Sequence, residues 1–242
     1  MRIGLTYNLK PDLPPAPGDP IDRYEEFDSE ETVEAVSQSL RRLGHEVERL
    51  GWGPPMLDAL IRRAQGDRLD GVFNFAEGVG GRGRESQVPA MLEMLGIPNT
   101  GSDPVALALA LDKGLAKIFA AGHGIATAPF KIVGADEALG AVNLRYPLFA
   151  KPVAEGSSMG IRNGSICRDH DELATLVAQL QVDYRQPVLV EEFLPGDEYT
   201  VGVLGNGRHA EVIGLMQVLP RDTSVDFVYS LEVKRDYRNR VI

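Results

Sequence analysis

The stretch KPVAEGSSMGI, Lys151 to Ile161, decides both the fold and the chemistry that the sequence suggests. A lysine closes the apolar run YPLFAKP, and a short loop then places two serines between two glycines. Glycines let the backbone approach a ligand closely, and successive N–H groups together with two hydroxyls can donate to anionic oxygens. The loop is therefore a candidate phosphate-binding loop, although a short glycine–serine turn taken alone is more often a plain hairpin.

Two common phosphate motifs do not match this stretch. Its lysine precedes the glycines, so it is not the G-x-x-x-x-G-K-[ST] loop. No G-x-G-x-x-G opens a helix after the first predicted strand either. Phosphate binding must therefore be argued from the rest of the chain.

Charged and apolar residues elsewhere support phosphate binding. Lys151 ends the strand before the loop, and a second cation, Lys113, follows Asp112 on an alanine-rich stretch. A second apolar strand ends in EEFL, residues 191–194, with Glu198 shortly after it. Two cations, a donor-rich loop and acids suited to a ribose or an exocyclic amine predict a nucleotide site. Taken singly, each has a simpler interpretation, such as a solvated helix lysine or the exposed end of a strand.

Composition restricts the class of protein. The 242 residues carry 35 Asp and Glu against 25 Lys and Arg, a formal net charge of -10. This charge disfavours nucleic acid and anionic membrane as partners, since both need clustered cations. The single cysteine, Cys167, cannot form an internal disulfide, and no signal-peptide stretch is evident at the N-terminus. We therefore expect a cytoplasmic protein.

Strand and helix patterns alternate through the first hundred residues, which predicts parallel strands joined by crossover helices. The first helix is expected to begin near Asp28, which with Glu31 has capping-box spacing. The expected strands are residues 2–8, 46–51 and 69–77, and the expected helices are 28–43, 55–64 and 84–95.

A second, smaller α+β unit is expected after Asp103. It starts with two consecutive helices, and Gly114 is the expected break between them. The sequence GNG, residues 205–207, is expected to form the turn of a later hairpin. Strands are expected at 130–134, 146–153, 164–168 and 187–194, helices at 135–142 and 169–180, a hairpin at 198–220, a polar loop at 221–226 and a further strand at 227–234.

Three blocks of the sequence resemble the D-alanine–D-alanine ligase type of the ATP-grasp family. They are VFNFAEG…RES…LEMLGIPNTGSDPVALALALDK, YPLFAKPVAEGSSMGI and VLVEEFLPGDEYTVGVLG, in the family's order and spacing. The resemblance implies an α/β fold with a Rossmann-like domain at residues 1–103. It also implies a central ATP-grasp subdomain at 104–187 and a partial C-terminal subdomain at 188–242.

The resemblance also implies roles for individual residues. ATP phosphates would meet two lysines and the loop, adenine would lie among acids and aromatic rings, and a mobile lid would supply one more lysine. The implied nucleotide-binding residues are Lys113, Phe149, Lys151, Ser157, Ser158, Met159, Gly160, Glu191, Glu192, Phe193, Leu194, Glu198 and Lys234. Weaker candidates for substrate binding are Glu31, Glu77, Arg84 and Glu85, and no catalytic residue is assigned.

The chemistry that the resemblance implies has two steps. ATP phosphorylates a carboxylate to an acyl phosphate, and an amine then attacks to form an amide. With D-alanine as substrate, the product would serve peptidoglycan biosynthesis. Magnesium is expected for the complete family member, and a homodimer is an expectation of the family.

Two departures from the family pattern shape the prediction. LTYNLKPDLPPAPGDP stands where family members carry a glycine-serine-glutamate segment, which leaves the amino-acid or carboxylate substrate open. The family's metal ligands follow the lid, so we expect no metal site before Ile242 and little or no activity from this chain alone. The alternatives are a ligase for a different amino acid and a non-catalytic nucleotide-binding or interaction protein derived from the fold.

Overall fold

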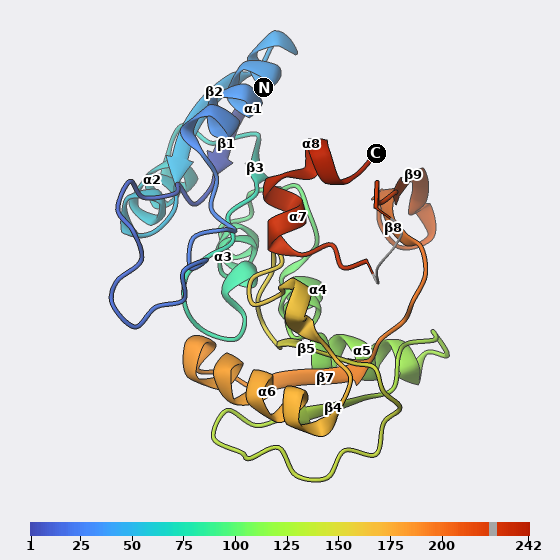
Figure 1. Cartoon of the computed structure of the whole chain (residues 1–242). Coiled ribbons are helices and arrows are strands. Elements are labelled where there is room, and N and C mark those ends of the chain that lie inside the picture. Colours follow the sequence, from blue (N-terminus) through green and yellow to red (C-terminus); the bar gives the residue numbers. More distant parts are fainter. Residues whose placement is uncertain (223–226) are drawn as a thin grey trace.

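Three β-sheets organise the protein, for which a computed structural model describes residues 1–222 and 227–242 (Figure 1). The strands are β1 (Arg2–Thr6), β2 (Glu46–Gly51), β3 (Gly71–Asn74), β4 (Phe130–Val133), β5 (Leu148–Pro152), β6 (Ile166–Cys167), β7 (Val188–Glu192), β8 (Glu198–Leu204) and β9 (Glu211–Val218). The helices are α1 (Glu30–Arg42), α2 (Pro54–Gln65), α3 (Gln87–Met94), α4 (Pro104–Leu111), α5 (Lys113–Gly122), α6 (His170–Tyr184), α7 (Leu231–Arg235) and α8 (Tyr237–Arg240). Short 3-10 turns are η1 (Arg84–Ser86), η2 (Asn163–Ser165) and η3 (Gly207–His209).

The first sheet is parallel, with strand order β2-β1-β3. Helix α1 covers one face through Val33, which packs with Leu5 of β1. Helices α2 and α3 cover the other face, where Leu60 and Leu92 pack with Val72 of β3. The predicted parallel layer with crossover helices is confirmed.

The first helix begins one residue later than the capping pattern predicts. Ser29 is the N-cap, and its hydroxyl accepts a hydrogen bond from the Thr32 N–H at 3.1 Å. The Asp28 cap is therefore wrong, because the Asp28 N–H instead donates to the Asn8 carbonyl. Glu31 lies exposed on the first turn of α1.

The second sheet is antiparallel, with strand order β4-β7-β5-β6, and α6 packs against one of its faces (Figure 1). Successive side chains of a strand point to opposite faces. Leu148 and Ala150 of β5 are accordingly buried against Leu173 of α6, while Phe149 and Lys151 occupy the opposite face. This alternation creates a face on which a polar site can form.

Three expected elements after Asp103 are wrong in detail. The joint of the helix pair is Asp112, which caps α5 by accepting from the Leu115 N–H, and not Gly114. Residues 135–142 do not form a helix, because the Gln181 side chain of α6 bonds the carbonyls of residues 134 and 137 instead.

The third correction concerns residues 227–234. Their expected strand is wrong, because the Ser230 hydroxyl caps a helix, α7, that carries Lys234. The polar loop expected at 221–226 falls partly outside the described residues.

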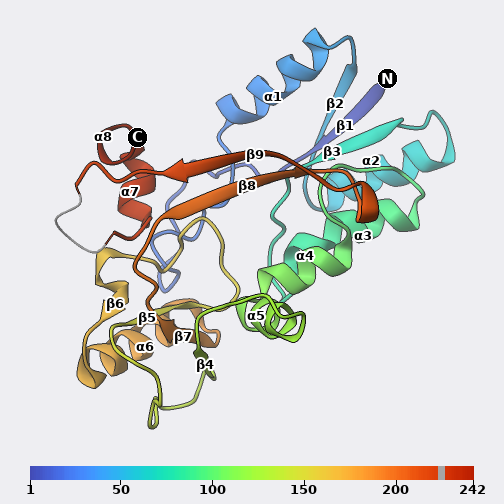
Figure 2. The same cartoon turned by 90° about the vertical axis from the view of Figure 1, so that its right-hand side faces the viewer.

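The predicted hairpin after Glu198 is confirmed as the β8–β9 ribbon, which extends as a long two-stranded arm in Figure 2. Both of its strands carry exposed apolar residues, among them Val203 and Leu215. The side chain of Cys167 is buried in the core under α6. Among the described residues, no helix is long and apolar enough to cross a membrane.

Candidate functional site

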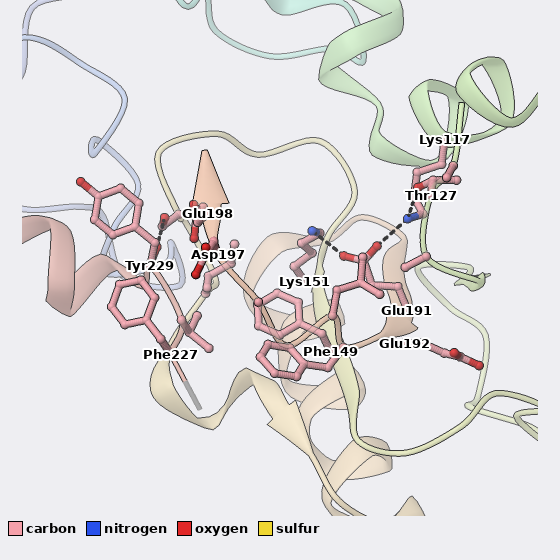
Figure 3. Close-up of a pocket in the computed structure, with 18 of the residues that line it drawn as sticks. Lys117, Thr127, Phe149, Lys151, Glu191, Glu192, Asp197, Glu198, Phe227 and Tyr229 are labelled. Atoms are coloured by element: carbon pink, nitrogen blue, oxygen red, sulfur yellow. Dashed lines mark hydrogen bonds and ion pairs between the residues drawn. The ribbon is translucent and has the colours of Figure 1, made fainter. Parts of the chain in front are cut away.

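A pocket of about 530 Å³ lies on the face of the second sheet that α6 leaves open (Figure 3). This volume is within the usual range for small-molecule sites, roughly 300–1,000 Å³. Residues from α5, β5, β7, α7 and the loop after β5 contribute to its walls. Nine of the thirteen sequence-predicted nucleotide residues line it, namely Phe149, Lys151, Ser158, Glu191, Glu192, Phe193, Leu194, Glu198 and Lys234.

One carboxylate holds two cations in the wall of this pocket. The register of β5 against β7 places Phe149 opposite Glu191, so Lys151 is a diagonal neighbour of that acid. The Lys151 ammonium lies 2.6 Å from one carboxylate oxygen of Glu191, and the Lys117 ammonium lies 2.6 Å from the other. Lys117 also donates to the Thr127 hydroxyl at 2.7 Å. The side chains of all three charged residues are at most 21% exposed.

The electrostatics of Glu191 follow from this geometry. Burial would raise the pKa of its carboxyl, but the charges and hydrogen bonds of Lys151 and Lys117 outweigh burial and lower it. The group is therefore a carboxylate at neutral pH. Two positive charges are fixed beside the pocket before any ligand enters.

Lys117 is a pocket residue that the sequence motifs did not reveal. It lies four residues after Lys113 on the same helix, a spacing that places two side chains on one helix face. That spacing was the available signal. A search for cations one turn from the predicted phosphate lysine would have found it.

Aromatic rings line the pocket next to these charges. The Phe149 and Phe193 rings lie 6.3 Å apart between centroids, and the Lys151 ammonium sits 5.3 Å from the Phe149 ring. Phe227 and Tyr229 form a stacked pair with centroids 6.3 Å apart. A flat ligand with an apolar ring and an anionic end would meet matching surfaces here.

The loop after β5 is joined to the segment before α7 across the mouth of the pocket. The Ser158 hydroxyl donates to the Tyr229 carbonyl at 2.9 Å, and the Lys234 ammonium lies 5.4 Å from the Tyr229 ring. Burial lowers the pKa of Lys234, and the charge of Glu198 partly offsets that effect. Lys234 is thus on a helix rather than a strand, and it lines the pocket.

Four predicted residues do not line the pocket, and Lys113 is the most informative of them. Its ammonium donates to the Glu155 and Val153 carbonyls just beyond β5. Burial, together with the nearby charge of Lys151, lowers its pKa to about 8. The other three, Ser157, Met159 and Gly160, belong to the loop itself, and the Met159 side chain is buried.

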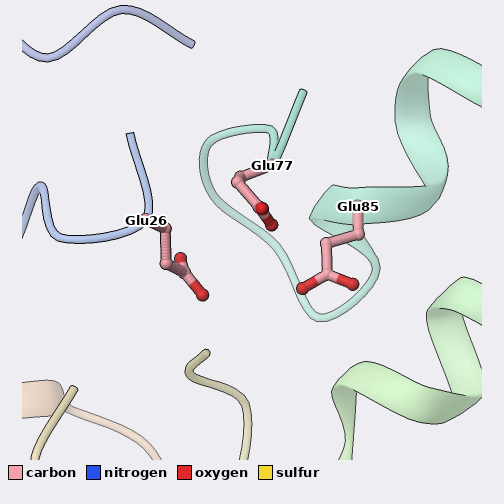
Figure 4. Close-up of side chains that lie close together, drawn as sticks. All are labelled: Glu26, Glu77 and Glu85. Carbon is pink, nitrogen blue, oxygen red and sulfur yellow. The ribbon is translucent and has the colours of Figure 1, made fainter. Parts of the chain in front are cut away.

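Two of the weaker substrate candidates, Glu77 and Glu85, lie close together with Glu26 in a second place, shown in Figure 4. Carboxylate oxygens of Glu26, Glu77 and Glu85 all lie within 4.8 Å of one another. Burial, followed by the charge of Glu26, raises the pKa of Glu77 to about 7. Buried Arg84 pairs with Glu26, so its guanidinium is already occupied by a carboxylate of the protein. Glu31 does not belong to this cluster.

Comparison with known proteins gives one family and several relatives. A family model described as D-ala D-ala ligase C-terminus matches residues 119–240. A D-alanine–D-alanine ligase of Gluconobacter oxydans is 32% identical over 209 residues, covering 86% of this chain and 65% of the relative. One of Syntrophotalea carbinolica is 36% identical over 199 residues, covering 81% and 60%. The chain therefore spans less than two thirds of the length of these relatives.

A solved structure shares the fold. The D-alanine–D-alanine ligase of Bacillus anthracis in complex with ATP aligns with a TM-score of 0.67 at 20% identity. The alignment covers 97% of this chain and 73% of that structure. At this identity the comparison supports the architecture described above and leaves the ligand to be argued from the site.

Proposed function

The chain belongs to the D-alanine–D-alanine ligase-like ATP-grasp family, and we propose that it binds ATP in the pocket lined by Lys151 and Glu191. The observation that supports this most is the gathering of nine predicted nucleotide residues in one pocket. We further propose that the bound ATP serves a carboxylate–amine ligation of D-alanine–D-alanine ligase type.

In this proposal the pocket divides into an adenine end and a phosphate end. Adenine packs against Phe149 and Phe193, and its exocyclic amine donates to an acid at the end of β7. Glu198 accepts from the ribose hydroxyls. The phosphates lie towards Lys151 and Lys234, whose ammonium groups neutralise their charge.

The reaction that we propose joins two molecules through an activated acid. A substrate carboxylate oxygen attacks the γ-phosphorus of ATP, the bond to the β-phosphate oxygen breaks, and ADP leaves. The amine of the second substrate then attacks the acyl carbon, and phosphate leaves with the electron pair of the broken C–O bond. The loop after β5 and α7 would exclude water from the acyl phosphate, which hydrolysis would otherwise destroy.

The second substrate is an amine, and the acidic cluster is the place where we propose that an ammonium binds. Glu77 and Glu85 have carboxylates that can accept its N–H groups, while Arg84 holds Glu26 in place. With a pKa of about 7, Glu77 can also take up a proton from an ammonium at neutral pH. D-alanine fits this description, as does another small amino acid. With D-alanine the product belongs to peptidoglycan biosynthesis.

Magnesium, which we expect for complete family members, is not assigned here to the acids that end β7, because both are already paired with cations of the protein. Glu191 is paired with two lysines, and Glu192 with Arg145. The acidic cluster could offer ligands, but Glu26 already accepts from Arg84 and the Gly156 N–H.

This disagreement favours a second candidate function, nucleotide binding without turnover. It also keeps open the prediction that the 242-residue chain is inactive on its own. The two functions differ in one measurable product. A ligase releases ADP when ATP, magnesium and a suitable amino acid are present, whereas a binding protein does not.

Calorimetric titration with ATP and magnesium tests the site. Lys151→Ala should weaken ATP binding by about 10- to 100-fold, because a charge-assisted contact contributes about 1.5–3 kcal/mol. Lys131→Ala is the matched control, since that lysine lies on β4 of the same sheet and bonds the Ala141 carbonyl outside the pocket. Equal affinity of both variants would remove Lys151 from the site. ADP release with a panel of small D- and L-amino acids then tests the reaction.

A further inference from the structure

A loop near the N-terminus lies against the glycine–serine loop, which is the stretch from Gly156 to Gly160. Residues 9–28 lie in the connection between β1 and α1, and we call them the N-terminal loop. Its two ends are bound to each other, because Leu9 and Asp28 form a β-bridge and the Lys10 N–H donates to the Asp28 carbonyl at 2.8 Å. In Figure 2 this blue segment approaches the yellow segment that follows β5.

Asp22 is the innermost residue of the N-terminal loop, with a side chain that is fully buried. One of its oxygens accepts from the Gly160 N–H at 3.0 Å and from the Arg162 guanidinium at 2.6 Å. The other accepts from the Tyr184 hydroxyl at 2.6 Å. Burial would raise the pKa of Asp22, but these three partners outweigh it and lower that pKa. Asp22 is therefore a buried carboxylate with defined partners on both oxygens.

Glu26 makes a similar contact at the other end of the glycine–serine loop. One of its oxygens accepts from the Gly156 N–H at 2.6 Å, and the other pairs with Arg84. A Cβ on residue 156 would overlap this carboxylate, so a larger residue there would have to push Glu26 aside. Both glycine N–H groups of the stretch are thus held by carboxylates more than 120 residues earlier in the chain.

The backbone between these two anchors needs support. Ser157 and Ser158 have φ angles of +44° and +61°, and Gly160 has +72°. Left-handed backbone is unfavourable for residues with a Cβ, so such a pair of serines persists only where the surroundings impose it. Within the described part of the chain, no hydrogen bond uses the N–H of either serine. Those two N–H groups remain for a ligand.

We propose that Asp22 and Glu26 are positioning residues that hold the glycine–serine loop in the shape that offers the Ser157 and Ser158 N–H groups to phosphate. The inference rests on the proposed function, because it assigns those N–H groups to ATP. Each carboxylate is paired with an arginine, Arg162 or Arg84, so its charge is compensated and does not repel an incoming phosphate.

Asp22→Ala tests the proposal, with Asp22→Asn as the conservative variant. Asp19→Asn is the matched control, because Asp19 is an exposed acid of the same loop. Titration calorimetry with a non-hydrolysable ATP analogue and magnesium, and separately with adenosine, gives two affinities for each protein. We expect Asp22→Ala to lower the affinity for the triphosphate by about tenfold or more, and the affinity for adenosine by less than about twofold. The control should match the wild type for both ligands.

Each other result counts against the proposal in a different way. Unchanged triphosphate affinity in Asp22→Ala, with binding by the wild type intact, overturns the positioning role and leaves the proposed function standing. Equal weakening of both ligands shows general damage to the fold and also overturns that role. A wild type that binds neither ligand overturns the proposed function and the inference together.

Amide hydrogen exchange supplies a second measurement that does not depend on a ligand. In Asp22→Ala the Gly160 amide should lose its protection, while the amides of α6 keep theirs. A Gly160 amide as protected as in the wild type would show that Asp22 does not hold the loop.

Discussion

Replacing Glu191 with glutamine should destabilise the protein, because it leaves two largely covered ammonium groups without their shared carboxylate. Each ammonium lies 2.6 Å from a Glu191 oxygen, and the Glu191 side chain is 12% exposed. At an effective dielectric constant of about 20, each pair attracts by roughly 6 kcal/mol before the cost of burial. Removing one partner of a buried ion pair typically costs about 3–5 kcal/mol. Because glutamine still accepts one hydrogen bond, we expect a loss of about 3 kcal/mol.

Thermal unfolding measures this loss. For a chain of this size, about 3 kcal/mol corresponds to a fall of roughly 6–12 °C in Tm. Glu192→Gln is the matched control, because the neighbouring acid pairs with Arg145, whose side chain is 88% exposed. Such an exposed pair contributes little, so its loss should change Tm by less than about 2 °C. Equal Tm values for the two variants would refute the role of Glu191 as a bridge between buried cations.

The pH dependence of stability gives a second test of the same bridge. The pKa of Glu191 is lowered in the folded protein, because Lys151 and Lys117 outweigh burial. A carboxyl with a lowered pKa contributes stability above its unfolded pKa and loses it as the pH falls through the folded value. The difference in Tm between wild type and Glu191→Gln should therefore be full at pH 7 and shrink below about pH 4. A constant difference would show that the lost stability is not electrostatic.

Lys113, Glu77 and Gly160 give three more predictions. Burial and the nearby charge of Lys151 lower the pKa of Lys113 to about 8. A phosphate bound at Lys151 would offset that charge, so ATP binding at pH 8 should take up at most about half a proton. Calorimetry in two buffers of different ionisation enthalpy measures this uptake, which Lys113→Gln should abolish. Burial raises the pKa of Glu77 to about 7, so the free energy of unfolding should fall as the pH rises from about 5 through 7. Urea titrations at pH 5 and 8 should show a difference on the order of 1 kcal/mol, allowing for screening, and Glu77→Gln should remove it. Gly160→Ala should lower the free energy of unfolding by about 2 kcal/mol, because φ is +72° and the new Cβ would lie 2.6 Å from the Pro152 ring. In the control Gly164→Ala, no atom lies within 4 Å of the new Cβ, so this variant should match the wild type in the same urea titrations.

The parts of the site that lie on strand ends were predictable from local signals. Lys151 closes an apolar strand, and the acids after Val190 close another, so each strand carries charged groups that the apolar core cannot hold. The alternation of side chains along β5 then places Phe149 and Lys151 on the same face. Short-range periodicity carries this information, which explains why most of the predicted nucleotide residues meet in the pocket.

The errors have a different origin. Residues 227–234, FVYSLEVK, alternate like a strand, but the Ser230 hydroxyl caps a helix by accepting a hydrogen bond from the Val233 N–H. The helix expected at 135–142 does not form, because the Gln181 side chain donates to two carbonyls that would accept hydrogen bonds within that helix. In both places the hydrogen bonds of one side chain decide the local structure, which the pattern of apolar and polar residues does not specify.

The anchors of the glycine–serine loop left no signal in the sequence. Asp22 and Glu26 follow a proline-rich stretch without regular structure, and their partners come more than 120 residues later. Spacing rules describe neighbours on one helix or strand, so they cannot reveal such contacts. Only the tertiary arrangement shows that a Cβ at position 156 would displace the Glu26 carboxylate.

Two carboxylates of the site, Glu191 and Asp22, hold in place the groups that we propose bind the triphosphate. Binding a triphosphate requires cations and N–H groups that already point at the ligand, and ordering them during binding would cost affinity. Glu191 orders the cations, since it fixes Lys151 and Lys117 at 2.6 Å each. Asp22 orders the N–H groups, since it fixes the Gly160 end of the loop. Each carboxylate is itself compensated by positive charge, so an incoming phosphate meets a site that is prearranged and not repulsive. Removing either carboxylate should therefore weaken binding of the triphosphate more than binding of the nucleoside, although Glu191 and Asp22 lie on different elements and bond different partners.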